Sequence, residues 1–79
     1  MARFYFHLYN DIVSKDEEGR ELPDVDTARH DAREDARNMA AESVREGELN
    51  LDHYVEVADD AGEPLFRVTF GEVVRVTGQ

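Results

Sequence analysis

The sequence predicts an α+β domain in which one amphipathic helix covers one face of an antiparallel sheet. Two observations support this prediction. Between Asp24 and Gly47, alanines recur every four residues, which places them on one ridge of a helix. The segments on both sides of this helix alternate between apolar and polar residues, as half-buried strands do. The order of the segments gives a two-layer ββαββ arrangement.

Residues 3–9 predict the first strand. Their aromatic residues favour strands, and their alternation has a period of two. The apolar set should face the helix and the polar set should face away, which separates Phe4, Phe6 and Leu8 from Arg3, Tyr5, His7 and Tyr9.

A turn at Asn10-Asp11 should follow, and Ile12 with Val13 can begin a short second strand. The acidic segment 16–19 ends in Gly19, which can adopt a positive φ in a second turn. Residues 20–23 are expected to be extended, because Pro23 disfavours helix at the residue before it.

The helix is bounded by Asp24 as N-cap and by Gly47, which suits the left-handed position after a helix. A ridge of small side chains lets a helix lie close to a sheet. The expected core stripe consists of Val25, Ala28, Ala32, Ala36, Met39, Ala40 and Ser43.

Residues 53–58 and 63–70 predict the second hairpin, joined by the tight turn 59–62. A four-residue loop would place Phe66 opposite Val55. A bulged turn would instead place Arg67 there, which is less favourable because it buries a charge. The core should span about residues 3–70, and the tail 71–79 is compatible with a strand, a helical turn or a strap that binds a partner.

The composition describes one small acidic domain, residues 1–79. The net charge is −10, and residues 46–66 contain seven acids and no Lys or Arg. Such surfaces repel phosphate backbones and anionic lipid, so we expect neither nucleic-acid nor membrane binding. No stretch approaches the length of a membrane span. The chain contains no cysteine, which fits a reducing cytoplasm.

The uncovered face of the sheet is the best candidate interaction surface. One helix can cover only one face, which leaves the polar side of the first strand free for contacts or for ordinary cross-strand pairs. The candidate residues are Arg3, Tyr5, His7, Tyr9, Tyr54 and Arg67.

Other clusters are weaker candidates. Arg29, Arg33 and Arg37 form a stripe that could bind an anion or an acidic partner, or simply pair with acids such as Asp26 and Glu34. Around His30, the carboxylates of Asp26 and Glu34 could hold a weak metal ion. The acidic turn lacks the spacing of an EF-hand loop; its residues are Asp16, Glu17, Glu18 and Glu21.

The sequence contains few residues or motifs that are typical of catalysis or cofactor binding. There is no cysteine, no G-x-S-x-G, no glycine-rich phosphate loop and no H-E-x-x-H. His7 could act as a base, but the sequence assigns it no orienting partner. We therefore expect no enzymatic activity and no cofactor.

The chain resembles a family of small uncharacterised bacterial proteins whose domain has no known function. The resemblance rests on the aromatic strand 3–8, the acidic glycine turn 16–19 and the run Glu-Leu-Pro-Asp at 21–24, followed by the alanine-rich helix and the turn 59–62. It implies the same fold and a bacterial cytoplasmic setting, and it implies no catalytic or binding residue.

Three functions follow as hypotheses. The first is a non-enzymatic interaction module that forms a homodimer through the uncovered face, because a small core gains stability from association. The second is an acidic regulatory or antitoxin-like partner of a basic protein. The third is a weak metal binder or small enzyme that uses His7 or His30.

Overall fold

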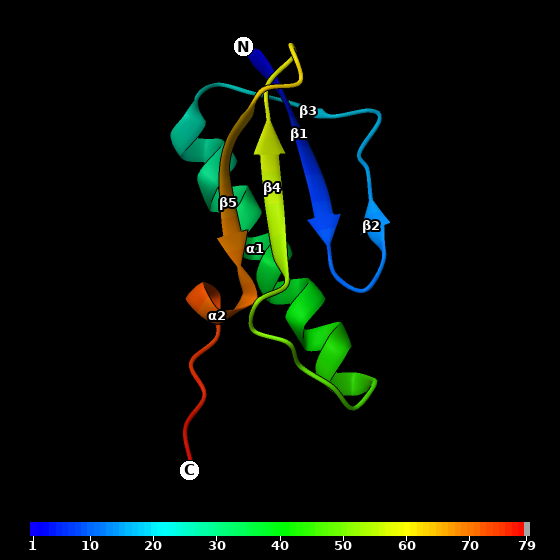
Figure 1. Cartoon of the computed structure of the whole chain (residues 1–79). Coiled ribbons are helices and arrows are strands. Elements are labelled where there is room, and N and C mark those ends of the chain that lie inside the picture. The colour runs from blue at the N-terminus through cyan, green and yellow to red at the C-terminus, as the bar shows by residue number, and fades with distance from the viewer. Residues whose placement is uncertain (79) are drawn as a thin grey trace.

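A single antiparallel sheet with strand order β2–β1–β4–β5 forms the centre of the molecule, and β3 also pairs with β1 (Figure 1). The computed structural model describes residues 1–78. The α+β prediction is confirmed, with one long helix packed against the sheet. In chain order the elements are β1 (Ala2–Tyr9), β2 (Val13–Ser14), β3 (Arg20–Leu22), α1 (Val25–Arg45), β4 (Tyr54–Ala58), β5 (Pro64–Thr69) and α2 (Phe70–Val73).

Both ends of α1 are capped as the sequence predicts. Asp24 has an extended backbone, and its side chain accepts the N–H of Thr27 at 2.8 Å. Gly47 has a φ of 98°. The N–H of Gly47 donates to Val44 O, and that of Glu48 donates to Ser43 O, which is the Schellman pair of bonds that closes a helix.

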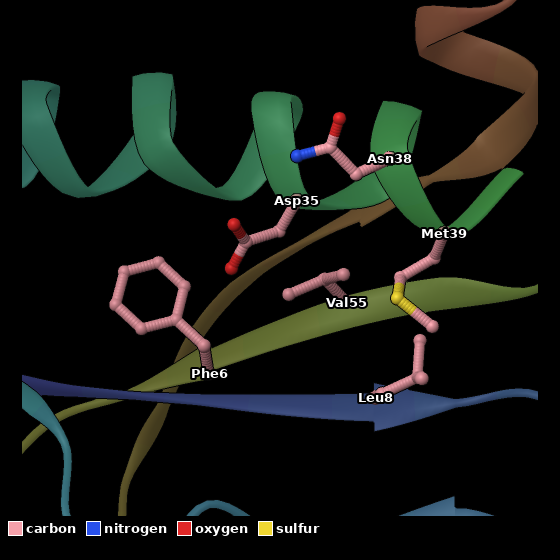
Figure 2. Close-up of a pocket in the computed structure, with 6 residues that line it drawn as sticks. All are labelled: Phe6, Leu8, Asp35, Asn38, Met39 and Val55. Atoms are coloured by element: carbon pink, nitrogen blue, oxygen red, sulfur yellow. The ribbon is translucent and has the colours of Figure 1, made fainter. Parts of the chain in front are cut away.

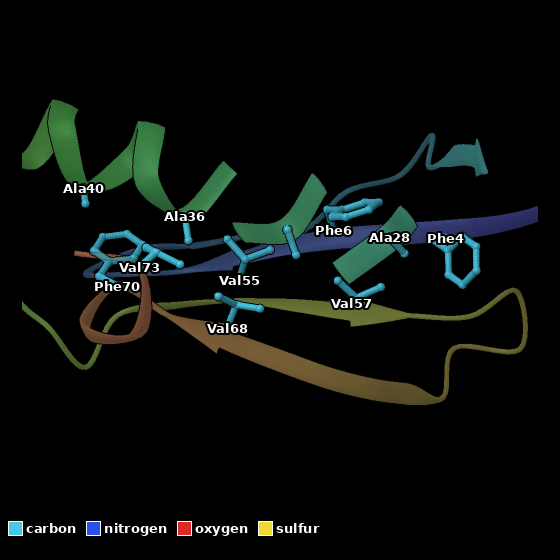
Figure 3. Packing of buried hydrophobic residues seen from close by; sticks show 11 residues of the cluster. Phe4, Phe6, Ala28, Ala36, Ala40, Val55, Val57, Val68, Phe70 and Val73 are labelled. Carbon is cyan, nitrogen blue, oxygen red and sulfur yellow. The ribbon is translucent and has the colours of Figure 1, made fainter. Parts of the chain in front are cut away.

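The alanine ridge faces the sheet. Ala28, Ala32 and Ala36 have no exposed surface, so α1 lies close against β4 and β5. Val25 does not belong to the buried stripe, because 44% of its surface is exposed; it lies in the first turn, before the helix meets the sheet. The alanines meet the buried side chains that Figure 3 shows, namely Phe4, Phe6, Val55, Val57, Val68, Phe70 and Val73.

The register between β4 and β5 corrects both expectations from the sequence. Phe66 lies opposite Val57, and Val68 lies opposite Val55, so neither Phe66 nor Arg67 pairs with Val55. The reason is local. The side chain of Asp59 accepts two N–H groups inside the turn, and an irregularity between Val57 and Ala58 places one extra residue in β5.

The core extends past residue 70. Phe70–Val73 form the helical turn α2, which Thr69 and Glu72 cap reciprocally, and Val73 is buried. Among the strand, helical turn and strap predicted as alternatives for the tail, the structure has the helical turn, and residues 74–78 follow it without helix or strand. Gln79 lies outside the described residues. Among residues 1–78, no helix has the length and apolarity needed to cross a bilayer.

Candidate interaction surface

The face of the sheet opposite α1 carries the polar side of each long strand, and Figure 1 looks onto this face with α1 behind it. The register aligns Tyr9 with Tyr54, and it places His7, Glu56 and Arg67 in one row across β1, β4 and β5. Side chains of paired residues lie on the same side of a sheet, so these residues share one surface. This uncovered face consists of Arg3, Tyr5, His7, Tyr9, Tyr54, Glu56 and Arg67.

A tyrosine cluster, made of Tyr9, Tyr54, Lys15 and Arg67, forms the best-ordered part of the uncovered face. The two tyrosine rings stack with centroids 4.8 Å apart and planes 12° apart. The Arg67 guanidinium lies 4.8 Å from the Tyr54 centroid, and the Lys15 ammonium lies 5.1 Å from that of Tyr9.

Lys15 also donates a hydrogen bond to the hydroxyl of Tyr9 at 2.8 Å. This bond raises the pKa of the fully exposed Lys15 ammonium. A lysine amine is charged at neutral pH, so the two tyrosine rings have a cation on each side, Lys15 beside Tyr9 and Arg67 beside Tyr54.

His7 is held by the backbone. Its Nδ1 accepts the N–H of Asp16 at 3.0 Å, so the neutral ring carries its proton on Nε2. A shallow hollow of about 210 Å³ lies beside it, between Tyr5 and the turn after β4. With Nδ1 already accepting a bond, His7 is a structural residue of the face and is not arranged as a general base.

Arg3 is turned toward the edge of the sheet. Its guanidinium donates to Glu18 O at 2.7 Å and pairs with Glu21 at 2.9 Å. Gly19, with a φ of 73°, lies so close that an added Cβ would come within 3.0 Å of both Arg3 and Tyr5. The acidic turn therefore packs on this end of the uncovered face.

Of the six residues predicted for the surface, the structure brings Tyr9, Tyr54 and Arg67 into direct contact. Tyr5 and His7 continue the same face along β1, and Arg3 belongs to the turn contact instead. All six are on the predicted side of the strands.

Sequence reasoning missed two residues of the face. Glu56 lies between His7 and Arg67, and its alternation with Val55 and Val57 was the signal that could have found it. Lys15 reaches Tyr9 because the chain folds back through β2, which no periodicity reveals.

The arginine stripe of α1 is only partly paired. Arg37 pairs with Glu34 at 2.8 Å and donates to Val73 O, in line with the alternative that these arginines simply pair with acids. Arg29 instead lies over the ring of Phe66, 4.2 Å from its centroid, and makes no ion pair with Asp26.

Neither proposed cation site is assembled. In residues 1–78, no group of three or more histidine and carboxylate side chains is placed to hold a metal ion, and this includes the trio around His30. In the acidic turn, Asp16 acts on the backbone. Its carboxylate accepts the N–H groups of Phe6, Glu18 and Gly19 at 3.0–3.1 Å.

A second hollow, of about 250 Å³, lies between α1 and β1 (Figure 2). Its walls are mostly hydrocarbon, from Phe6, Leu8, Met39 and Val55, with Asn38 and Asp35 on the helix side. The Asp35 carboxylate already pairs with Arg20. This hollow therefore presents no unpaired ionisable group.

These elements define a small two-layer α+β domain with an aromatic, partly cationic sheet face. Residues 3–71 match the family described as a domain of unknown function, DUF6894, and the chain belongs to this family. The resemblance inferred from the sequence to such a family is confirmed. Neither the curated proteins nor the solved structures contain a match.

Proposed function

We propose that this protein is a small non-enzymatic interaction module that self-associates through the uncovered face of its sheet. The observation that carries the proposal is the tyrosine cluster: two stacked rings with a cation beside each, on the face of the sheet opposite α1. Tyrosine and arginine are the residues most enriched at protein interfaces.

The charges on this face support contact between two copies despite the net charge of −10. Glu56 lies beside Arg67 in the cross-strand row, and Lys15 lies at the other side of the tyrosine cluster. A two-fold interface places each side chain against a different one on the second copy, so a face with both signs can complement itself.

Sedimentation equilibrium from about 10 µM to 1 mM protein tests this proposal, over a range typical of weak dimers. We expect a concentration-dependent dimer of the 9.0 kDa chain. The double substitution Tyr9→Glu, Tyr54→Glu should abolish the dimer, because it adds charge to the interface and removes both rings. His30→Glu, on the exposed side of α1, is the matched control and should still dimerise.

Circular dichroism must show that the double variant keeps its helix. A strict monomer of the wild-type chain over the whole range would contradict the proposal. So would a dimer that the double variant retains.

A second candidate function is an acidic partner of a basic protein, in a bacterial cytoplasmic setting. A polar hollow of about 170 Å³ supports it, because Asp11, Glu46 and Glu48 contribute to its walls. Binding of poly-L-lysine that weakens with salt, and weakens further in Glu46→Gln, Glu48→Gln, would support this candidate. Binding that ignores both changes would exclude it.

A further inference from the structure

The outer edge of β5 is open. Within residues 1–78, β5 pairs only with β4. The N–H of Phe70 donates to His53 O at 2.8 Å, which sets the alternation of bonds along the pair. Phe66 and Val68 therefore bond to β4, and the backbone N–H and C=O groups of Arg67 point away from the sheet.

On the opposite side of the sheet, the outer backbone of β1 is occupied. β3 pairs with the first part of β1, and β2 pairs with its last part. Between them, the N–H of Phe6 donates to the carboxylate of Asp16 at 3.0 Å. The outermost strands on this side, β2 and β3, have only two and three residues, so β5, with six, offers the longer open edge to a further strand.

Arginines flank the open edge on both faces of the sheet. On the helix side, Arg29 lies over Phe66, and Arg37 reaches Val73 just beyond the end of β5. Arg33 is on the same ridge between them. On the uncovered face, Arg67 lies on β5 itself.

Three of these side chains have no carboxylate partner. Arg29, Arg33 and Arg67 form no ion pair in residues 1–78, although the chain contains nineteen acids and nine bases. Two nearby carboxylates are engaged elsewhere, since Glu34 pairs with Arg37 and Glu72 accepts the N–H of Thr69.

We propose that the open edge of β5 binds an extended acidic segment of a partner protein as an added strand. The backbone of that segment would pair with Arg67 and its neighbours. Its side chains would alternate between the two faces, so carboxylates on one side would meet Arg29 and Arg33, and those on the other would meet Arg67.

The same arginines disfavour the pairing of two β5 strands, since like charges would then face each other. The net negative charge does not override the local attraction. At 0.1 M salt the Debye length is about 10 Å, so a strand at the edge senses the charges beside β5, these arginines among them, more than the acids in the rest of the chain.

The probe is a fluorescent ten-residue peptide that repeats Glu-Glu-Val-Val, which places carboxylates on both faces of a strand, and the control peptide repeats Lys-Lys-Val-Val. Fluorescence anisotropy at 0.1 M and 1 M NaCl measures binding, and amide NMR shifts locate it. We expect the acidic peptide to bind, to shift the amides of residues 64–69, and to bind more weakly at high salt. The basic peptide should not bind.

Two comparisons sharpen this test. Arg29→Gln, Arg33→Gln should weaken binding about tenfold, whereas Arg45→Gln, on the last turn of the same helix, should leave it unchanged. An acidic peptide that is N-methylated at every residue keeps its charge but has no backbone donor on either edge, and it should not bind.

The proposal is overturned if the N-methylated peptide binds as well as the parent, since main-chain pairing would then be irrelevant. It is also overturned if the shifts fall on Tyr9, Lys15 and Tyr54 and not on residues 64–69, or if the acidic peptide fails to bind at 0.1 M NaCl. Tyr9→Glu alone, which leaves Tyr54 beside Arg67 in place, should still bind the peptide, which separates this site from self-association through the uncovered face.

Discussion

The two sides of the sheet differ in whether the outward-facing backbone N–H and C=O groups of the long outer strands, β1 and β5, have partners. At the β1 edge, two short strands and the carboxylate of Asp16 together satisfy the outward-facing backbone of β1. At the β5 edge, the backbone stays open, and arginines from α1 and from β5 stand beside it.

The difference shows that an edge can be closed by side chains as well as by strands. β2 and β3 are too short to meet, and Asp16 fills the gap between them with one acceptor. At the β5 edge, charge and Pro64 discourage indiscriminate pairing without occupying the hydrogen-bonding groups. That edge can therefore still accept a partner of the right charge.

Truncation of Phe70, which anchors the end of β5 in the core, should have the largest effect on stability. Phe70 is fully buried at the junction of β5 and α2, and its ring meets His53 edge-on at 5.7 Å. Phe70→Ala should lower the free energy of unfolding by about 3–5 kcal/mol. Urea denaturation measures this change in the free energy of unfolding. Leu65→Ala, on the exposed part of β5, should change it by about 0.5 kcal/mol or less.

A cost for Leu65→Ala as large as that for Phe70→Ala would show that β5 is buried by something that the monomer does not contain. In that case the edge is not open.

The turn that closes the β1 side should be the next most sensitive point. Gly19→Ala combines a positive φ with contacts of 2.9–3.0 Å from the new Cβ, and it should cost about 1–3 kcal/mol. Gly62→Ala is the matched control, with a φ of 82° and nothing within 4 Å. Equal costs in thermal denaturation would mean that the turn does not pack on Arg3 and Tyr5.

The carboxylate of Asp16 should make the closed edge sensitive to acid. Partial burial raises the pKa of Asp16, but the N–H donors of Phe6, Gly19 and Glu18 and the charge of Arg20 outweigh it and lower the pKa overall. A lowered pKa in the folded state means that the stabilisation is present at neutral pH and is lost as the pH falls below about 4.

Asp16→Asn should therefore cost about 1–2 kcal/mol at pH 7. The difference in unfolding free energy between this variant and the wild type, measured by urea denaturation, should become progressively smaller below about pH 4. Asp60→Asn, in the exposed hairpin turn, should have the same unfolding free energy as the wild type both at pH 7 and below about pH 4. A difference in unfolding free energy between Asp16→Asn and the wild type that does not narrow as the pH falls would rule out this role for the carboxylate.

The ion pairs of Arg20 should have the smallest effect. Arg20 joins β3 to Asp31 and Asp35 of α1, and its guanidinium lies 4.0 Å from the ring centroid of Phe6. Because the pairs are partly exposed, Arg20→Gln should cost only about 0.5–1 kcal/mol, and less at high salt. A cost that does not change with salt would assign the effect to packing on Phe6.

Local patterns predicted most of the fold. The alternation of residues 3–9 separated the two faces of β1 correctly, and the caps Asp24 and Gly47 bound α1 as expected. The register of β4 and β5 was wrong, because the side-chain bonds of Asp59 and the extra residue in β5 set it.

Contacts between segments that are far apart in the chain could not be predicted from sequence patterns. The surface was predicted by its alternating residues, but the stack of Tyr9 on Tyr54 depends on the pairing of β1 with β4 across more than forty residues. The contact of Lys15 with Tyr9 and the pairing of Arg20 with Asp35 depend in the same way on how the chain folds back.

The most direct test of the central proposal is a concentration series of NMR spectra of the wild-type chain. Self-association through the uncovered face predicts shifts that grow with protein concentration at Tyr9, Tyr54 and Arg67 and that leave the helix-facing residues unchanged. Shifts confined to the other backbone amides of β5, or spectra that do not change up to millimolar protein, would contradict it.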